Sequence, residues 1–371
     1  FPGGFFSRHP KVDLDLGTIH GVPAVMPGAW GSHLGLVDLV LDNSSGRWKV
    51  TSGKGFLRPI YDKAARKSVA APDPLVAQLI SPEHDATVAH MAAEVARTTA
   101  PITSYFALVA DDPSVQVVAL AQREHARSLL RGTPYEKLPL LSAASPFKAG
   151  GRMGPSYYTD FPAGPVALRH VASLYVYPNV IKAVKLNGAQ VREWLEMSAG
   201  MFRQIDPKGP AEQELMNDAF VSYNFDSIEG VSYAIDVTQP ARYAPKGPLV
   251  APQARRIVDL RYNGQPIDEA AEFIVVTNNY RASGGGAFPN LTGKNIVLDS
   301  QDENRGAVAA YLARQQTFNP SADNNWRIQP VPGVKLRFQS GEAAIAHLER
   351  YPQIKLVKRQ GDGWALFELT E

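Results

Sequence analysis

The sequence predicts a mixed α/β fold of the α+β type. Segments with the two-residue period of strands and segments with the 3.6-residue period of helices alternate irregularly along the 371 residues, and several strands come in hairpin-like pairs. A regular βαβ series fits this order less well. The chain has 44% hydrophobic residues, and at about 150 residues per domain its length indicates two domains.

The first part of the chain has the pattern of a hairpin. Residues 34–41 form a nearly continuous apolar run, residues 42–46 are a turn of Asp, Asn, Ser and Gly residues, and residues 47–51 begin a return strand. A hairpin alone is marginally stable in water. We therefore expect another part of the protein to cover it.

A helical period replaces the strand pattern at about residues 73–100, with apolar positions such as Leu75 and Leu79. Pro82 should either kink one helix or begin a second one that Ser81 caps. A charged, alanine-rich helical stretch after a strand-rich segment is typical of a connector. We expect a domain boundary there.

Both periods are mixed in the rest of the chain. The patterns predict helices at residues 115–130, 190–202, 306–314 and 342–350, and strands at residues 231–237, 273–277, 334–338, 354–357 and 364–369.

Composition excludes several classes of function. The net charge is +2, from 38 basic and 36 acidic residues, so the chain lacks the charge excess that binding to a nucleic-acid polymer requires. The absence of cysteine excludes thiol catalysis, cysteine-ligated metals and disulfides. No apolar run reaches the roughly 18 residues of a membrane-spanning helix. The chain opens on Phe1 without a signal segment, so we expect position 1 to be a processing or artificial boundary.

No motif for a metal site or a nucleophile is present. The eight histidines include no His-x-His, no HExxH and no pair at i,i+4. Glu196 stands where a nucleophile elbow around Ser198 would need its first glycine. We therefore predict no catalytic and no metal-ligating residue, and the residues indicate a binding surface rather than a reaction centre.

The strongest local candidate is a glycine-rich segment after the strand predicted at residues 273–277. The strand leads to Tyr280 and then to Gly284, Gly285 and Gly286, which permit close approach of the backbone to a ligand. Tyr280 could stack on a flat base. An ordinary glycine-rich turn with a core tyrosine is the commoner alternative.

Two further segments are candidates. Residues 174–179 have a strand-like alternation that places Tyr175 and Tyr177 on one face, before Pro178 ends the strand. Aromatic filling of a sheet core is the alternative. In residues 147–152, Lys148 and Arg152 could bind an anion, or they could lie on a solvated loop.

Several motifs together point to a family. They lie at residues 21–28, 174–179, 223–226, 236–243, 278–286, 302–305 and 323–327. In this order they resemble the bacterial periplasmic 2',3'-cyclic-nucleotide 2'-phosphodiesterases/3'-nucleotidases, which belong to the wider 5'-nucleotidase family. The resemblance runs over the whole length.

The resemblance implies two domains, an N-terminal calcineurin-like metallophosphoesterase domain with two metal ions and a C-terminal domain that binds the nucleoside. It implies that residues 1–70 are the closing strands of the calcineurin-like sandwich, that residues 71–100 are a helical connector, and that residues 101–371 are the 5'-nucleotidase C-terminal-like domain. The metal ligands would then precede Phe1, and this chain alone would lack the catalytic metal site.

The resemblance also implies roles for individual residues. Tyr177 and Tyr280 match the two aromatic residues that sandwich the base, Asn179 matches an asparagine near the base, and Arg152 matches an arginine that helps to hold phosphate. Gly284 and Gly285 belong to the glycine loop. Gly286 departs from the many 5'-nucleotidases that have an aspartate contacting ribose there, which is consistent with a differently oriented cyclic or 3'-nucleotide.

The function implied is nucleotide or nucleoside binding within a metal-dependent phosphohydrolase that acts on 2',3'-cyclic nucleotides and 3'-nucleotides. Two divalent metal ions would belong to the full-length parent. The implied partners are the nucleotide and the N-terminal domain, without nucleic-acid polymer or membrane, in a monomeric periplasmic protein. The alternatives are part of a 5'-nucleotidase/UDP-sugar hydrolase-type enzyme, or a non-catalytic nucleoside-binding module of the cell envelope.

Overall fold

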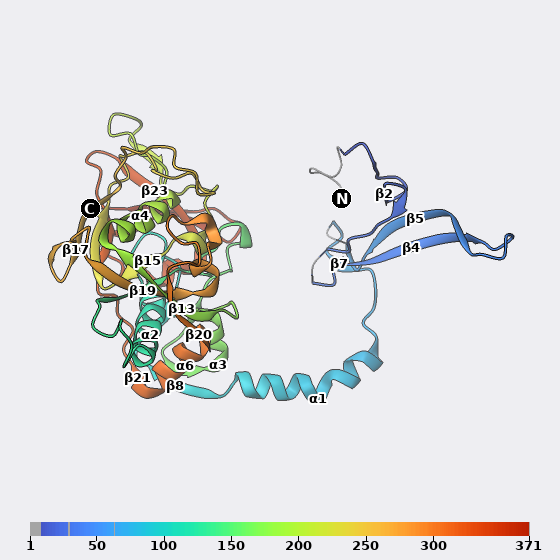
Figure 1. Cartoon of the computed structure of the whole chain (residues 1–371), viewed down its shortest axis with the longest axis horizontal. Helices are drawn as coiled ribbons and strands as arrows, with labels where there is room; N and C mark the ends of the chain where they lie inside the picture. Colours follow the sequence, from blue (N-terminus) through green and yellow to red (C-terminus); the bar gives the residue numbers. More distant parts are fainter. Residues whose placement is uncertain (1–8, 29, 63, 371) are drawn as a thin grey trace. The chain divides into compact units, whose positions relative to one another are not determined.

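The structure is a computed structural model that describes residues 9–28, 30–62 and 64–370 (Figure 1). The chain divides into two compact units, residues 1–87 and residues 88–371. Helices and strands are mixed in the second unit, which confirms the predicted mixed α/β class. None of the helices in the described residues is both long and apolar enough to cross a membrane.

The first unit consists mainly of a long hairpin and most of one helix, which continues to the start of the second unit. Strands β4 (His33–Asp42) and β5 (Lys49–Pro59) pair antiparallel, which confirms the predicted hairpin. Short strands surround it: β1 (Val12–Asp13), β2 (Thr18–Ile19), β3 (Val22–Pro23), β6 (Tyr61–Asp62) and β7 (Lys67–Ser68). Helix α1 (Pro74–Met91) continues through Pro82 as one helix and buries none of its residues.

The second unit is built around a five-stranded sheet with the strand order β15-β10-β19-β13-β20. Its centre pairs β10 (Leu140–Ala144) with β19 (Glu272–Asn278) in parallel, and β13 (Val180–Asn187) with β19 in antiparallel orientation. The outer strands are β15 (Ser227–Glu229) and β20 (Ile296–Glu303). The carboxyl end of β19 therefore lies beside the start of β13, where Asn278 pairs with Ile181.

Helices α2 (Pro113–Leu129), α3 (Leu168–Leu174) and α6 (Asn304–Gln315) lie together at one end of this unit. Strand β8 (Glu94–Thr98) lies at the same end (Figure 1). Residues 94–98 are thus a strand, so the predicted extension of the helical pattern to residue 100 is wrong. Strand β8 pairs with β12 (Gly164–Ala167) and β21 (Thr317–Phe318), and β9 (Ile102–Thr103) pairs with β11 (Asp160–Phe161).

Two four-stranded sheets complete the unit. One has the order β18 (Gln265–Pro266), β17 (Ile257–Tyr262), β16 (Val231–Ile235) and β22 (Trp326–Ile328); the other has the order β14 (Glu212–Glu214), β23 (Lys335–Gly341), β25 (Trp364–Leu369) and β24 (Ile354–Arg359). The remaining helices are α4 (Gly188–Ser198), α5 (Asn279–Ala282) and the short 3-10 helices η2 (Gly151–Met153), η3 (Ala199–Met201), η4 (Ser222–Asn224), η5 (Gly285–Ala287) and η6 (Glu342–Arg350).

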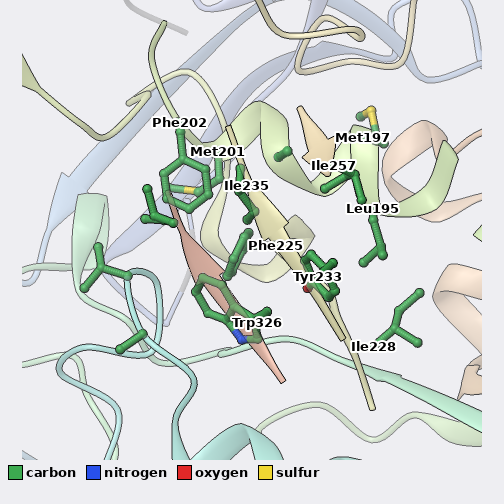
Figure 2. Close-up of a cluster of buried hydrophobic side chains, with 14 of the residues drawn as sticks. Leu195, Met197, Met201, Phe202, Phe225, Ile228, Tyr233, Ile235, Ile257 and Trp326 are labelled. Carbon is green, nitrogen blue, oxygen red and sulfur yellow. The ribbon is translucent and has the colours of Figure 1, made fainter. Parts of the chain in front are cut away.

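The main core lies between α4 and the sheet that contains β16 and β22 (Figure 2). Phe225 is at its centre and makes edge contacts with Phe202 and Trp326, with ring centroids 5.4 and 5.2 Å apart. All three side chains are buried. Because Phe225 lies one residue before Asp226 and two after Tyr223, this core anchors a segment that contributes to the candidate site described below.

Next to α2, the carboxyl group of Asp323 lies near that of Asp111 and near that of Glu229. Asp111 precedes the helix, Glu229 lies on β15, and Asp323 lies before β22. Burial, and then the negative charge of Asp323, raise the pKa of Asp111 to about 7. Burial also raises the pKa of Glu229, although Arg123 pairs with it at 2.8 Å. In the folded chain, Asp111 therefore keeps its proton up to about pH 7. In an unfolded chain, the same carboxyl group releases its proton at about pH 4.

We predict that Asp111 makes folding stability pH-dependent with a definite sign. The native state binds the extra proton more tightly than the unfolded state, so its stabilisation is complete at about pH 4 and is lost as the pH rises to about 7. Asp111→Asn should flatten the dependence of the urea midpoint on pH over this range, whereas the exposed Asp362→Asn should not. An unchanged pH profile in Asp111→Asn would contradict this account.

Candidate functional site

A cavity of about 590 Å³ opens in the second unit, between segments that are far apart in the sequence. Aromatic side chains dominate one part of its wall, and Glu214 and Asp218 lie in another. Of the predicted site residues, Arg152 and Tyr177 line the cavity, whereas Asn179, Tyr280, Gly284 and Gly285 lie outside its lining. The lining includes the aromatic residues Phe147, Tyr157, Tyr177 and Tyr223 and the basic residue Arg152.

Tyr177 lies on an irregular segment rather than on a strand. Helix α3 ends at Leu174 and β13 begins at Val180, so the predicted strand over residues 174–179 is wrong. The expected common face of the two tyrosines is also wrong, because Tyr175 is 1% exposed while Tyr177 is 40% exposed. Six residues of alternation cannot distinguish a helix end from a strand. The ring of Tyr177 packs edge-on against Phe147 at 5.2 Å.

Electrostatic effects on Tyr177 identify the groups around it. Partial burial raises the pKa of the Tyr177 phenol, the phenols of Tyr157 and Tyr223 raise it further, Arg152 lowers it, and Tyr280 raises it. Because such effects decay with distance, these side chains share one region of the surface. Both predicted aromatic residues and the predicted arginine therefore lie in one region, although Tyr280 follows Tyr177 by more than 100 residues.

Tyr280 lies on α5, directly after β19, and its side chain is 46% exposed. The backbone of Gly285 lies directly against its ring. A Cβ atom at Gly285 would come within 2.6 Å of two ring carbons of Tyr280, so position 285 requires glycine. Gly284 has φ +98°, a left-handed conformation that glycine adopts readily. The two predicted glycines thus allow the loop to turn back beneath the tyrosine.

A buried ion pair holds this loop. Arg281 and Asp226 are 2% and 4% exposed, and their side chains pair through Nε to Oδ2 at 2.7 Å and Nη2 to Oδ1 at 3.1 Å. Trp194 donates a further hydrogen bond to Asp226 Oδ2 at 2.8 Å.

The other donors of Arg281 reach the surrounding loops. They bind the carbonyl of Gly285 at 2.6 Å, the carbonyl of Tyr223 at 3.0 Å and Asn224 Oδ1 at 3.1 Å. Because each buried donor has an acceptor, the guanidinium connects residues 223–226 rigidly to the Tyr280 loop.

Gly286 lies against the same ion pair. It has φ +77°, and a Cβ atom there would approach Arg281 Nη1 to 2.3 Å and Asn224 Oδ1 to 2.6 Å. The loop in this conformation therefore has no room for an aspartate at position 286, in agreement with the departure seen in the sequence.

Asn179 is turned toward the interior of the fold. Its side-chain amide donates to the hydroxyl of Tyr175 at 3.3 Å, and Asn278 donates to the same hydroxyl at 3.0 Å. These bonds join the ends of the segments that carry Tyr177 and Tyr280. A contact of Asn179 with a base stays a prediction.

Arg152 lies on η2, between glycines with positive φ at positions 150, 151 and 154, and its side chain is exposed. Within the residues that the structure describes, no carboxylate pairs with it. Lys148 differs, because its ammonium group donates to Ser173 Oγ at 3.1 Å and burial lowers its pKa. Of the two predicted cations, Arg152 is the one available to an anionic ligand in the cavity.

Sequence reasoning missed Tyr157 and assigned no role to Tyr223 or Phe147. In the sequence, Tyr223 stands out only as part of the motif at residues 223–226, and Phe147 only as the start of the basic loop at residues 147–152. The sequence contains no periodic signal for them, because each lies on a loop or short 3-10 helix whose position depends on distant contacts.

The described residues contain no group of three or more His, Cys, Asp or Glu side chains that could hold a metal ion.

Comparisons with known proteins agree on one family. The model of the 5'-nucleotidase C-terminal domain matches residues 86–293. The Bacillus subtilis "Trifunctional nucleotide phosphoesterase protein YfkN" is 44% identical over 370 residues, covering 100% of this chain and 25% of the relative. The 2',3'-cyclic-nucleotide 2'-phosphodiesterase/3'-nucleotidase of Salmonella typhimurium is 45% identical over 383 residues, covering 100% of this chain and 59% of the relative. The chain thus spans only part of both relatives.

The solved structure of the "Putative 5'-Nucleotidase from Staphylococcus aureus in complex with alpha-ketoglutarate" is similar, with a TM-score of 0.58. The match is 20% identical and covers 87% of this chain and 55% of that one. At this identity the similarity concerns the fold.

We predict that removal of either partner of the buried ion pair destabilises the second unit strongly. Asp226→Asn or Arg281→Met leaves the other charge buried and uncompensated, with an expected cost of about 3–5 kcal/mol in unfolding free energy. The exposed pair of Glu124 and Arg314 provides the control, because Glu124→Gln should cost less than about 1 kcal/mol. Chemical unfolding measures both. Equal, small losses in the two pairs would show that Arg281 and Asp226 are not the anchor.

Proposed function

This chain belongs to the 5'-nucleotidase family, with that family's C-terminal domain at residues 86–293, and we propose that its second unit binds the nucleotide substrate of a phosphohydrolase. The substrates we propose are 2',3'-cyclic nucleotides and 3'-nucleotides, the compounds named for the Salmonella relative. We propose a periplasmic location, as the resemblance in the motifs implies.

The observation that carries this proposal is the pair of half-exposed tyrosines, Tyr177 and Tyr280. Each is presented by a short segment that buried polar contacts hold in position, and Tyr280 lies close enough to raise the pKa of the Tyr177 phenol. A half-exposed aromatic ring leaves apolar surface in contact with water, and a flat ligand can cover that surface. Nucleobases of every kind stack on such rings. We propose that the base lies between the two rings.

Arg152 supports the same assignment. It lies on the wall of the cavity with its guanidinium free of carboxylates in the described part of the chain, and it lies close enough to affect the Tyr177 phenol. A guanidinium can hold two phosphate oxygens at once. We propose that it binds the phosphate of the nucleotide whose base stacks on Tyr177.

We further propose that residues 1–70 are the closing strands of a metallophosphoesterase domain and that residues 71–100 connect it to the binding domain of residues 101–371. The hairpin of β4 and β5 supports this, because apolar side chains are exposed along both strands, among them Leu34, Leu39, Leu41 and Val50. Such a surface is typical of a sheet that packs against further strands. Two divalent metal ions would belong to that domain in the full-length parent.

We predict that loss of either aromatic ring weakens nucleoside binding. Tyr177→Ala and Tyr280→Ala should each reduce affinity for adenosine by roughly 1–3 kcal/mol, measured by calorimetry. Tyr177→Phe keeps the π-face and should bind nearly as well as the original chain. Tyr61→Ala is the matched control, since Tyr61 is 47% exposed but lies in the first unit. Unchanged affinity in both alanine variants would refute the stacking site.

We also predict that this chain binds 3'-AMP without hydrolysing it. The described residues contain no cluster that could hold a metal ion, so Mn²⁺ or Co²⁺ should produce no phosphate release above the protein-free rate. Binding is measured by calorimetry and release by a phosphate assay. Metal-dependent turnover would contradict the division of roles, whereas absent binding would favour a different role for the family fold.

A further inference from the structure

The segment that carries Tyr177 has few backbone hydrogen bonds of its own. It lies between the end of α3 and the start of β13, so its carbonyl groups do not take part in the hydrogen bonds of a helix or a sheet. Carbonyl groups of this kind must be bound by other groups if the segment is to have one conformation.

Helix α6 supplies these bonds from its first two residues. Arg305 donates from Nε to the carbonyl of Tyr175 at 3.1 Å and from Nη2 to the carbonyl of Val176 at 2.7 Å. The backbone N–H of Asn304 donates to the carbonyl of Asn179 at 3.0 Å. Two consecutive residues of α6 therefore bind the segment on both sides of Tyr177.

The bond to Val176 acts directly on Tyr177. The peptide group that joins Val176 to Tyr177 is planar, so the position of its carbonyl oxygen determines the direction in which the chain enters Tyr177. The ring then rests edge-on against Phe147. With the entry direction and one ring edge determined, the π-face of Tyr177 has little freedom to turn.

Among the described residues, the Arg305 side chain donates its hydrogen bonds to the carbonyls of Tyr175 and Val176. It is half-buried, forms no ion pair there with a carboxylate, and does not line the cavity. Its charged donors are used on carbonyl groups, where a charged donor binds more strongly than a neutral one.

We propose that Arg305 is a positioning residue for Tyr177, which orients the stacking ring through the carbonyls of Tyr175 and Val176 without touching the ligand. This inference rests on the proposed nucleotide-binding function. Pre-orientation of the ring reduces the entropy that ligand binding would otherwise lose. The affinity for a base should therefore depend on Arg305.

The test measures adenosine affinity by calorimetry in the full 371-residue chain. Arg305→Met keeps the length of the side chain and removes its donors, and should weaken binding by about fivefold or more, part of the effect of Tyr177→Ala. Arg305→Lys can serve one carbonyl and should recover part of the loss. Arg314→Met, on the same helix but at the surface, should bind like the original chain.

A double-mutant cycle separates positioning from general destabilisation. Arg305→Met should add little to the loss caused by Tyr177→Ala, because the ring that it positions is already absent. It should add more to the loss caused by Tyr280→Ala, because Tyr177 is still present there and Arg281 holds the segment of Tyr280. Should Arg305→Met fail to fold, Arg305→Lys and Arg305→Gln carry the same cycles.

The outcomes are distinguishable. Additive losses with Tyr177→Ala, or an unchanged affinity in Arg305→Met while Tyr177→Ala binds weakly, would overturn the positioning role and leave the proposed function intact. An unchanged affinity in both Tyr177→Ala and Tyr280→Ala would overturn the proposed function and this inference with it.

Discussion

The buried ion pair of Arg281 and Asp226 joins the two segments on which the candidate site is built. Two charges in a protein interior are stable only when their hydrogen-bonding capacity is satisfied. Here Trp194, Asn224 and two backbone carbonyls complete the shell around the pair. The Tyr280 loop therefore has one conformation, and glycine at positions 285 and 286 follows from the space that the ring and the guanidinium occupy.

An arginine that binds backbone carbonyl groups supports each of the two tyrosines. Arg281 binds carbonyl groups beneath Tyr280, and Arg305 binds carbonyl groups before Tyr177. The hydroxyl of Tyr175 receives hydrogen bonds from Asn179 and Asn278, which join the two supports. Half-exposed aromatic rings on a rigid backbone suit a flat ligand. Because the rings are already oriented, binding loses little conformational entropy of the protein.

Much of the fold follows from local sequence, and part of the site does not. The hairpin of β4 and β5, the helix α2 and the strand β19 lie close to their predicted positions, because long periodic segments carry a strong signal. Residues 174–179 were misread because a short apolar alternation before Pro178 fits a helix end equally well. Tyr157 and Phe147 line the cavity without a signal in the sequence, because loops have no period.

Local sequence thus specifies the residue types of the candidate site: the tyrosines at 177 and 280, the glycines after 283 and the arginine at 152, each recognisable within its motif. The packing of distant segments specifies which of them meet. Tyr177, Tyr223 and Tyr280 are separated by dozens of residues, and their common region exists because β13 pairs with β19 and Arg281 pairs with Asp226. Such contacts depend on the whole buried core. A polar group without a hydrogen-bond partner is destabilising only where the core excludes water, so the core is what favours these pairings.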